Sequence, residues 1–229
     1  MESHFRSLLT FVPDLLQRKV LDLGSGRGKF LVDMAKRGAH VVGYERSPDY
    51  VEISRKALAD AGHGHVEVIR GMAEELPFSE ASFGFANVSE VIEHVEDPYA
   101  ILMELYRVIE PGGYAYVSAP NRFGYRDPHY HLYFVNWMPR KFSDMYVRLR
   151  RMEKSHDGGA GRQELSAMHY YTHDAFCSLA HSIGWEVQDT RSVKIRRMPF
   201  AKRIPGIVLY AMLRPWYFDT FHFLLRKPA

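Results

Sequence analysis

Short apolar runs alternate along the chain with stretches in which apolar residues recur at helical spacing. Five runs are continuous enough to be strands covered on both faces of a sheet, at 20–23, 41–44, 66–69, 83–89 and 114–118. Helical stripes lie at 1–16, after Phe30, and at 48–61, 98–108 and 172–182, and further strands are expected at 185–193 and 218–225. This alternation predicts an α/β fold with a doubly wound sheet.

A glycine-rich turn joins the first strand to the helix that follows it. Gly24, Gly26 and Gly28 let the backbone turn sharply and pass close to a ligand. In dinucleotide sites the third glycine follows the second by three residues, whereas here it follows by two. Asp22, two residues before the first glycine, would repel a pyrophosphate but attract an ammonium group. The turn therefore predicts a cofactor that combines an adenosine with an amino acid.

The turn and Asp22 together resemble motif I of the class I S-adenosylmethionine (SAM) methyltransferases. The resemblance implies that Asp22 and the three glycines hold the methionine end of SAM. Glu45 ends the second apolar run about 20 residues after the turn, where a carboxylate can accept hydrogen bonds from both ribose hydroxyls. The resemblance also implies a Rossmann-like methyltransferase sheet of seven strands, with the last strand antiparallel.

The segment from Gly71 to Phe78 resembles the part of these enzymes that lies along the adenine. The resemblance implies that a backbone amide and the side chains of Met72 and Ala73 form the adenine rim. Family members usually have an acid at position 72, and methionine is a poor acceptor for the adenine amino group. Either the adjoining backbone contacts adenine alone or Glu74 replaces that acid. Ser89, after the fourth strand, is the remaining cofactor-binding candidate.

Two carboxylates and an imidazole also follow the fourth strand, at the edge where open α/β sheets bind ligands. If this segment is helical, Glu90, Glu93 and His94 stand at i, i+3 and i+4 and converge on one point. His129 or His131, after the fifth strand, would complete the group, and we assign His131 to it. The arrangement resembles the Glu-x-x-Glu-His cluster of ubiquinone-biosynthesis O-methyltransferases and of small-RNA 3′-end 2′-O-methyltransferases.

Glu90, Glu93, His94 and His131 are therefore the catalytic candidates and also the candidate ligands of a divalent metal. Methyl transfer from a sulfonium is a displacement that needs an in-line nucleophile, so positioning supplies much of the catalysis. A metal that holds both oxygens of neighbouring hydroxyls would lower the pKa of the nucleophile. Without a metal, His94 would act as an acid or base or would position the substrate.

Composition predicts a single domain over residues 1–229, since 46% hydrophobic residues can bury a substantial core. Cys177 is the single cysteine, so no internal disulfide is expected and a reducing, cytoplasmic compartment is favoured. No stretch approaches the roughly 18 uninterrupted apolar residues of a membrane span, and the N-terminus lacks the pattern of a signal peptide.

Charge is unevenly distributed behind the net value of +3. Residues 121–157 contain eight Lys or Arg against four acids, and residues 191–229 contain nine against one, so the rest of the chain is acidic. A chain whose acidic body carries two basic segments is not expected to bind nucleic acid as a uniformly basic protein does.

The first basic segment belongs to an insertion over residues 121–169, which is expected to form a lid on the substrate. Aromatic and arginine side chains there suit a ring, a sugar or an anionic group. Residues 155–161 contain three glycines and are expected to be a hinge. A helical stripe is expected to pack on the parent domain and consists of Phe142, Met145, Tyr146 and Leu149.

The second basic segment belongs to an insertion over residues 195–217. Basic residues flank a short apolar helix at 207–213 that has an aromatic end. This pattern suits peripheral contact with an anionic membrane or capture of a lipid-linked substrate, and equally a dimer interface or ordinary core.

These features together predict a SAM-dependent methyltransferase that acts by direct displacement on a hydroxyl of a small or lipid-linked acceptor. SAM is the expected cofactor, with a divalent metal as a second cofactor in one alternative. RNA 2′-hydroxyl methylation and a catalytically silent SAM-binding partner protein are the alternative functions.

Overall fold

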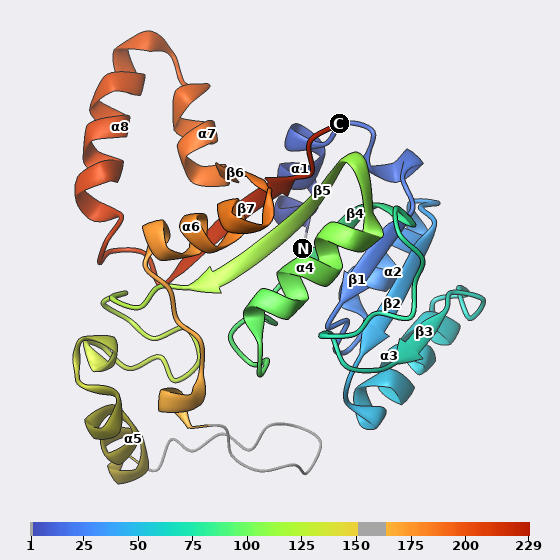
Figure 1. Ribbon diagram of the computed structural model, residues 1–229, viewed down its shortest axis with the longest axis horizontal. Helices are drawn as coiled ribbons and strands as arrows, with labels where there is room; N and C mark the ends of the chain where they lie inside the picture. Colours follow the sequence, from blue (N-terminus) through green and yellow to red (C-terminus); the bar gives the residue numbers. More distant parts are fainter. Residues whose placement is uncertain (1, 151–163) are drawn as a thin grey trace.

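A single mixed sheet forms the centre of the molecule in the computed structural model, which describes residues 2–150 and 164–229 (Figure 1). Its strands are β1 (Val20–Leu23), β2 (Val41–Glu45), β3 (Val68–Arg70), β4 (Phe83–Val88), β5 (Ile109–Pro120), β6 (Glu186–Asp189) and β7 (Thr220–Arg226). They are ordered β3-β2-β1-β4-β5-β7-β6, and β7 runs antiparallel to both of its neighbours, whereas the other pairs are parallel. The predicted seven-stranded sheet with an antiparallel last strand is confirmed.

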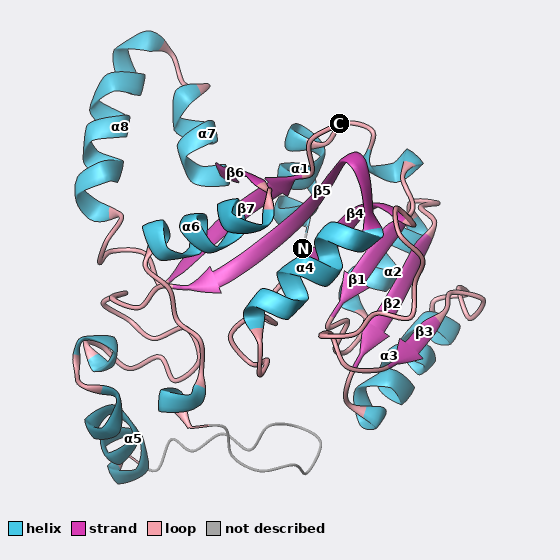
Figure 2. Cartoon of the chain, viewed as in Figure 1, coloured by secondary structure: helices cyan, strands magenta, loops and turns pink. Residues whose placement is uncertain are grey.

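Helices cover both faces of this sheet (Figure 2). They are α1 (Glu2–Phe11), α2 (Lys29–Lys36), α3 (Pro48–Asp60), α4 (Pro98–Val108), α5 (Arg140–Leu149), α6 (His173–Ile183), α7 (Thr190–Arg196) and α8 (Phe200–Leu213), with short 3-10 turns at Leu15–Gln17, Val135–Trp137 and Leu165–Ala167. Apolar residues of α4 and α6 pack with the strands on one face, and those of α1, α2 and α3 pack on the other. The two layers explain why β1, β2 and β4 are buried along their whole length.

The second half of the predicted strand 185–193 is a helix. β6 ends at Asp189, whose side chain accepts hydrogen bonds from the backbone N–H groups of Arg191 and Ser192. A carboxylate in this position caps a helix N-terminus, and α7 begins at the next residue. The cap therefore turns the chain out of the sheet, and α7 and α8 project from the body as a pair (Figure 1).

The segment between β5 and α6 has a small core of its own. Tyr130, Leu132 and Val135 pack there with Val147 of α5 and with Leu165. The expected packing of the α5 stripe is wrong for three of its four residues, because Phe142, Met145 and Leu149 are exposed, whereas Tyr146 packs against this small core. The predicted hinge at 155–161 lies outside the described residues.

Membrane-spanning helices are absent from the described part of the chain, since none of its helices combines the length and the apolar character needed to cross a bilayer.

Candidate functional site

The glycine turn lies between β1 and α2 and has left-handed backbone at all three glycines, with φ of +71° at Gly24, +52° at Gly26 and +74° at Gly28. A Cβ on Gly24 would lie 2.3 Å from Cγ2 of Val91, and one on Gly28 would lie 2.8 Å from Cβ of Ser54. Gly26 differs, because its nearest neighbour at that position would be the Gly24 carbonyl oxygen at 3.9 Å. Two glycines thus permit close packing of the protein, and the third leaves open space beside the turn.

Asp22 is 2% exposed and lies in the middle of the sheet. Its Oδ1 accepts a hydrogen bond of 2.7 Å from Nδ2 of Asn87, whose own Oδ1 accepts one from the Ser89 hydroxyl at 3.0 Å. Oδ2 of Asp22 and the Ser25 hydroxyl are buried without a hydrogen-bond partner among the described residues. Burial raises the pKa of Asp22 to about 7, the Asn87 hydrogen bond opposes this, and the Glu45 charge adds to it. A donor that carries positive charge would satisfy this carboxylate, and the predicted role of Asp22 toward an ammonium group remains a prediction.

Glu45 is buried at the end of β2 and holds the turn in place. Oε2 accepts a hydrogen bond of 2.8 Å from the Gly26 N–H, and Oε1 accepts one of 2.9 Å from the Ser47 N–H. Each carboxylate oxygen can accept further bonds, so a contact with ribose hydroxyls is compatible with this geometry. Glu45 therefore shapes the loop in addition to its predicted role.

The predicted adenine rim follows β3. Met72 is exposed, whereas Ala73 is partly buried against the core. Gly71 lies against the ring of Tyr44, whose hydroxyl donates to the Glu75 carbonyl at 3.3 Å. Glu74, the alternative acid, accepts a hydrogen bond of 3.2 Å from the Glu96 N–H. The assignments of Met72, Ala73 and Ser89 to the cofactor remain predictions.

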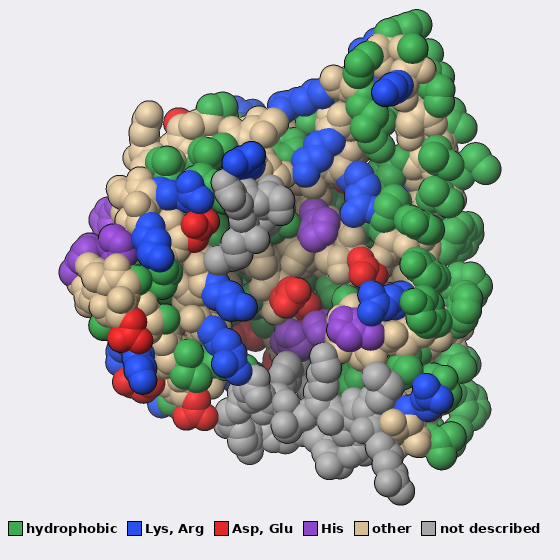
Figure 3. All heavy atoms as spheres, turned by 180° about the vertical axis from the view of Figure 1, so that it is seen from behind, with side chains coloured by type: hydrophobic (Ala, Val, Ile, Leu, Met, Phe, Trp, Pro, Cys, Tyr) green, Lys and Arg blue, Asp and Glu red, His purple; other side chains and the backbone are tan. Residues whose placement is uncertain are grey.

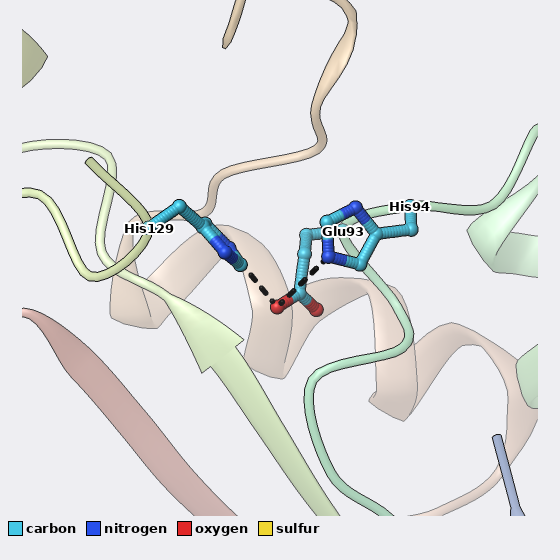
Figure 4. Close-up of side chains that lie close together, drawn as sticks. All are labelled: Glu93, His94 and His129. Atoms are coloured by element: carbon cyan, nitrogen blue, oxygen red, sulfur yellow. Dashed lines mark ion pairs between the residues drawn. The ribbon is translucent and has the colours of Figure 1, made fainter. Parts of the chain in front are cut away.

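Glu93, His94 and His129 come together at the C-terminal edge of the sheet (Figure 4). Glu93 is 1% exposed, and its Oε1 lies 3.4 Å from Nε2 of His129 and 4.0 Å from Nε2 of His94. One ligand atom from each residue lies within 4.8 Å of the other two. Oε2 of Glu93 is buried and has no hydrogen-bond partner among the described residues. These three groups can hold a proton or a metal ion.

The pKa of His129 reflects two opposing influences. Burial alone would lower it, but the nearby carboxylate of Glu93 outweighs burial, and the charges of Asp127 and Glu90 act in the same direction. The net result is a pKa above the ordinary value. Glu93 thus stabilises the imidazolium form of His129.

Glu90 is not part of this group, because the segment that follows β4 is a turn and not the expected helix. Its backbone is left-handed, with a φ of 58°, and its N–H donates to the Ser118 hydroxyl at 2.8 Å. The expected spacing of i, i+3 and i+4 on one helical face therefore does not apply. Val91, the next residue, packs instead on Gly24.

His131 is also absent from the group, and His129 takes its place. Asp127, which is fully buried, accepts hydrogen bonds from the N–H groups of His129 and Tyr130 and from the Tyr170 hydroxyl at 2.9, 2.6 and 2.8 Å. This side chain folds the segment into a tight turn. The His129 ring then lies 5.0 Å from that of His94, whereas His131 is exposed.

Two polar contacts in the sheet were not predicted from the sequence. Asn87 contacts Asp22 across neighbouring strands, and Tyr116 contacts His222, with 2.8 Å between Oη and Nδ1. Burial and the charge of Glu90 raise the pKa of Tyr116. The available signal was a polar residue inside an otherwise apolar strand, as in Phe-Ala-Asn-Val and Phe-His-Phe.

A hollow opens on the face of the molecule shown in Figure 3, and acidic and histidine side chains gather in it. On one side it is bounded by an edge along which hydrophobic side chains are exposed. The surface is therefore indented where charged and titratable groups are available to a ligand.

Comparisons with known proteins agree with this geometry. The model of a family described as "Methyltransferase domain" matches residues 21–117. The chain is 29% identical over 159 residues to a demethylmenaquinone methyltransferase of Bacillus velezensis, and the aligned region covers 66% of this chain and 68% of that relative. It is 29% identical over 167 residues to a ubiquinone biosynthesis O-methyltransferase of Acinetobacter baumannii, where the aligned region covers 68% of this chain and 69% of the relative. The solved structure of an S-adenosylmethionine-dependent methyltransferase from Mesorhizobium loti has the same fold, with a TM-score of 0.63, 18% identity and 97% of each chain covered.

Proposed function

We propose that this chain, which is a class I SAM-dependent methyltransferase, transfers the methyl group to a hydroxyl oxygen of a small, lipid-linked acceptor. The observation that carries the proposal is the group formed by Glu93, His94 and His129 at the C-terminal edge of the sheet. The names of the two curated relatives support an acceptor of the quinol type. A location in the cytoplasm, next to the membrane that holds such an acceptor, belongs to the same proposal.

The cofactor end of the site would hold SAM through groups that have no hydrogen-bond partner among the described residues. Oδ2 of Asp22 and the Ser25 hydroxyl would accept hydrogen bonds from the ammonium group, and the open space beside Gly26 would admit the backbone of the methionine. Glu45 would accept hydrogen bonds from the ribose while it keeps the Gly26 N–H in place. The methionine and ribose ends of SAM are therefore fixed before the acceptor arrives.

Methyl transfer is a single displacement. A lone pair of the acceptor oxygen forms a bond to the methyl carbon, the bond from that carbon to sulfur breaks, and S-adenosylhomocysteine leaves. The hydroxyl proton must be removed, and His129 is placed to take it because Glu93 stabilises the imidazolium that forms. His94, whose ring packs edge-on to that of His129, would help to position the acceptor.

The same residues fit a divalent cation. They offer a carboxylate oxygen and two imidazole nitrogens within 4.8 Å, and the second oxygen of Glu93 is buried and available. Such a cation would hold two neighbouring hydroxyl oxygens of the acceptor and lower the pKa of the one that is methylated. Two imidazoles in the ligand set favour a transition metal over magnesium.

The test is an assay of methyl transfer from labelled SAM to three acceptors: a catechol, a quinol with a polyprenyl tail, and a short RNA with a free 3′ diol. Each acceptor is assayed after chelation and after addition of Mg²⁺, Mn²⁺ or Zn²⁺. We expect the quinol to be the best acceptor, and mass spectrometry should place the methyl group on oxygen. Transfer to the RNA alone, or to a carbon or nitrogen atom of the small acceptors, would overturn the proposal. Turnover that persists after chelation would exclude a catalytic metal and leave His129 as the proton acceptor.

A further inference from the structure

We propose that one edge of the molecule, formed by α8, by α5 and by the aromatic residues between them, docks on an anionic lipid bilayer. We call this surface the apolar edge. Its members are the exposed residues Tyr133, Phe134, Trp137, Phe142, Met145, Leu149, Phe200, Ile204, Val208, Leu209, Met212, Trp216 and Tyr217. Figure 3 shows hydrophobic side chains along the whole length of this edge.

Helix α8 has one buried residue, Tyr210, and lies against Ile195 of α7 at Gly206, whereas most of its apolar side chains are exposed. Tyr210 is the buried residue of the helix, its hydroxyl donates to Asp189, and its ring lies 5.4 Å from that of Phe218. In contrast, Phe200 is 69% exposed and Met212 is 67% exposed. A helix of 14 residues is about 21 Å long, so this face is a substantial strip of unburied apolar surface.

A chain of aromatic contacts continues the strip from α8 toward α5. The Tyr217 ring stacks on Tyr125 with a centroid distance of 5.6 Å, and Tyr125 lies 5.7 Å from Tyr133. Further along, Phe134 meets the Trp137 ring edge-on at 5.3 Å. The indole N–H of Trp137 donates to a backbone carbonyl, which leaves the apolar part of the ring outward. Aromatic rings of this kind are enriched where a protein meets the boundary of a bilayer.

Helix α5 forms the other end of the strip. Phe142, Met145 and Leu149 recur at intervals of three and four residues and are exposed, with Leu149 at 78%. The opposite face of α5 packs against the protein, because Val147 belongs to the small core and the Ser143 hydroxyl donates a hydrogen bond to the Val135 carbonyl. The outward stripe therefore has no role in the packing of the described residues.

The positive charge of the segment around α8 indicates that the partner of this surface is an anionic membrane. Seven Lys or Arg and no Asp or Glu lie between residues 190 and 218. Lys202 is exposed within α8, and Arg196 is exposed at the end of α7, next to the apolar strip. Apolar side chains flanked by cations are what a helix in the plane of an anionic membrane presents to it. A second copy of this chain on the same face would bring like charges together with no acid in this segment to pair with them.

The apolar edge also borders the hollow that contains the acidic and histidine side chains (Figure 3). Docking would place the mouth of that hollow beside the bilayer. The inference does not depend on the proposed acceptor, because membrane binding is measured without turnover.

The experiment is sedimentation of the full chain with vesicles of pure phosphatidylcholine and with vesicles that also contain phosphatidylglycerol. We expect binding to the anionic vesicles that weakens as salt is raised. The variant Ile204→Ser/Val208→Ser/Leu209→Ser should bind at least tenfold more weakly, and Lys202→Glu/Arg203→Glu should lose the preference for anionic lipid. The matched control is Met103→Ser, which changes a similarly exposed apolar side chain on α4 and should bind as the unmodified chain does.

Unchanged SAM affinity and unfolding temperature would show that the triple variant is folded. Failure of the unmodified chain to sediment with either vesicle, or equal binding by the triple variant, would overturn the proposal. Light scattering provides a second test, because it measures the oligomeric state. If the unmodified chain is a dimer and the triple variant is a monomer, the apolar edge is a protein interface and the membrane proposal is overturned. A failed quinol assay together with lipid binding would refute the proposed acceptor alone.

Discussion

Asn87 donates a hydrogen bond of 2.7 Å to Oδ1 of Asp22 across the β1 and β4 pair, and it leaves Oδ2 of the same buried carboxylate without a partner among the described residues. Half of the carboxylate is thus positioned by the sheet and half is available to a ligand. Because burial raises the pKa of Asp22 to about 7, an ionised Asp22 weakens the unliganded fold.

Asp22→Asn should therefore weaken SAM binding by more than tenfold and stabilise the protein without SAM at alkaline pH. A folded-state pKa above the ordinary value means that the native state binds the proton more tightly, so stability is lost as pH rises from about 4 through 7. The difference in unfolding temperature between variant and unmodified chain should grow across this window. Calorimetry and thermal unfolding measure both effects, and Asp60→Asn, an exposed change, is the control. A variant that binds SAM normally would refute the ammonium assignment.

Glu45→Ala should lower SAM affinity by at least about tenfold, since a charge-assisted hydrogen bond contributes roughly 1.5 to 3 kcal/mol. Glu45→Gln separates its two roles. An amide oxygen can still accept from one backbone N–H, so the loop is partly retained, but the charge toward the ribose is lost. Titration of SAM and of adenosine should show that both variants bind both ligands more weakly than the unmodified chain does. Equal affinity of the unmodified chain and the two variants would exclude Glu45 from the ribose site.

Gly26→Ala and Gly38→Ala form a matched pair. Both glycines have positive φ, +52° and +78°, and neither Cβ would meet a close neighbour, so each change should cost about 1 kcal/mol of stability. Gly26→Ala alone should weaken SAM binding, because its methyl group would enter the space beside the turn. Chemical denaturation and SAM titration test the pair, and equal SAM affinity of the two variants would place the cofactor elsewhere.

His129→Gln should reduce methyl transfer by about a hundredfold or more, whereas His131→Gln should change it less than about threefold. Both are histidines of the same loop, but only His129 approaches Glu93. The measurement is kcat with saturating SAM, and SAM affinity should be unchanged in both variants. The opposite ranking would restore His131 to the site.

His173 joins α6 to β6 through Asp189, with 3.5 Å between Nε2 and Oδ2. Burial alone would lower its pKa, but the carboxylate of Asp189 and the hydrogen bonds with Cys177 and Asp174 raise it to about 10. The stabilisation by the protonated form is present in full below pH 6.5 and is lost as pH rises through about 10. His173→Gln should therefore lower the unfolding temperature at pH 7, and the deficit should shrink toward pH 10. A deficit that stays constant would show that the ion pair is not its source.

Local spacing explains why much of the cofactor end could be predicted. The strand, the glycine turn, Asp22 and Glu45 depend on residues that are neighbours in sequence or on the regular geometry of a parallel sheet. The acceptor end could not be predicted in the same way. The side-chain hydrogen bonds of Asp127 turn His129 inward, and the left-handed backbone at Glu90 prevents the helix that would have aligned three ligands.

The sequence by itself therefore determined the α/β order of elements. Its resemblance to the SAM-dependent methyltransferases implied the antiparallel last strand and the expected cofactor. Tertiary structure decided which histidine joins Glu93, the contact of Asn87 with Asp22, and the outward direction of the α5 stripe. The physical reason is the range of the interactions. Periodicity and turn chemistry act over a few residues, whereas these contacts join side chains that lie far apart along the chain and meet only when the sheet and its loops have closed.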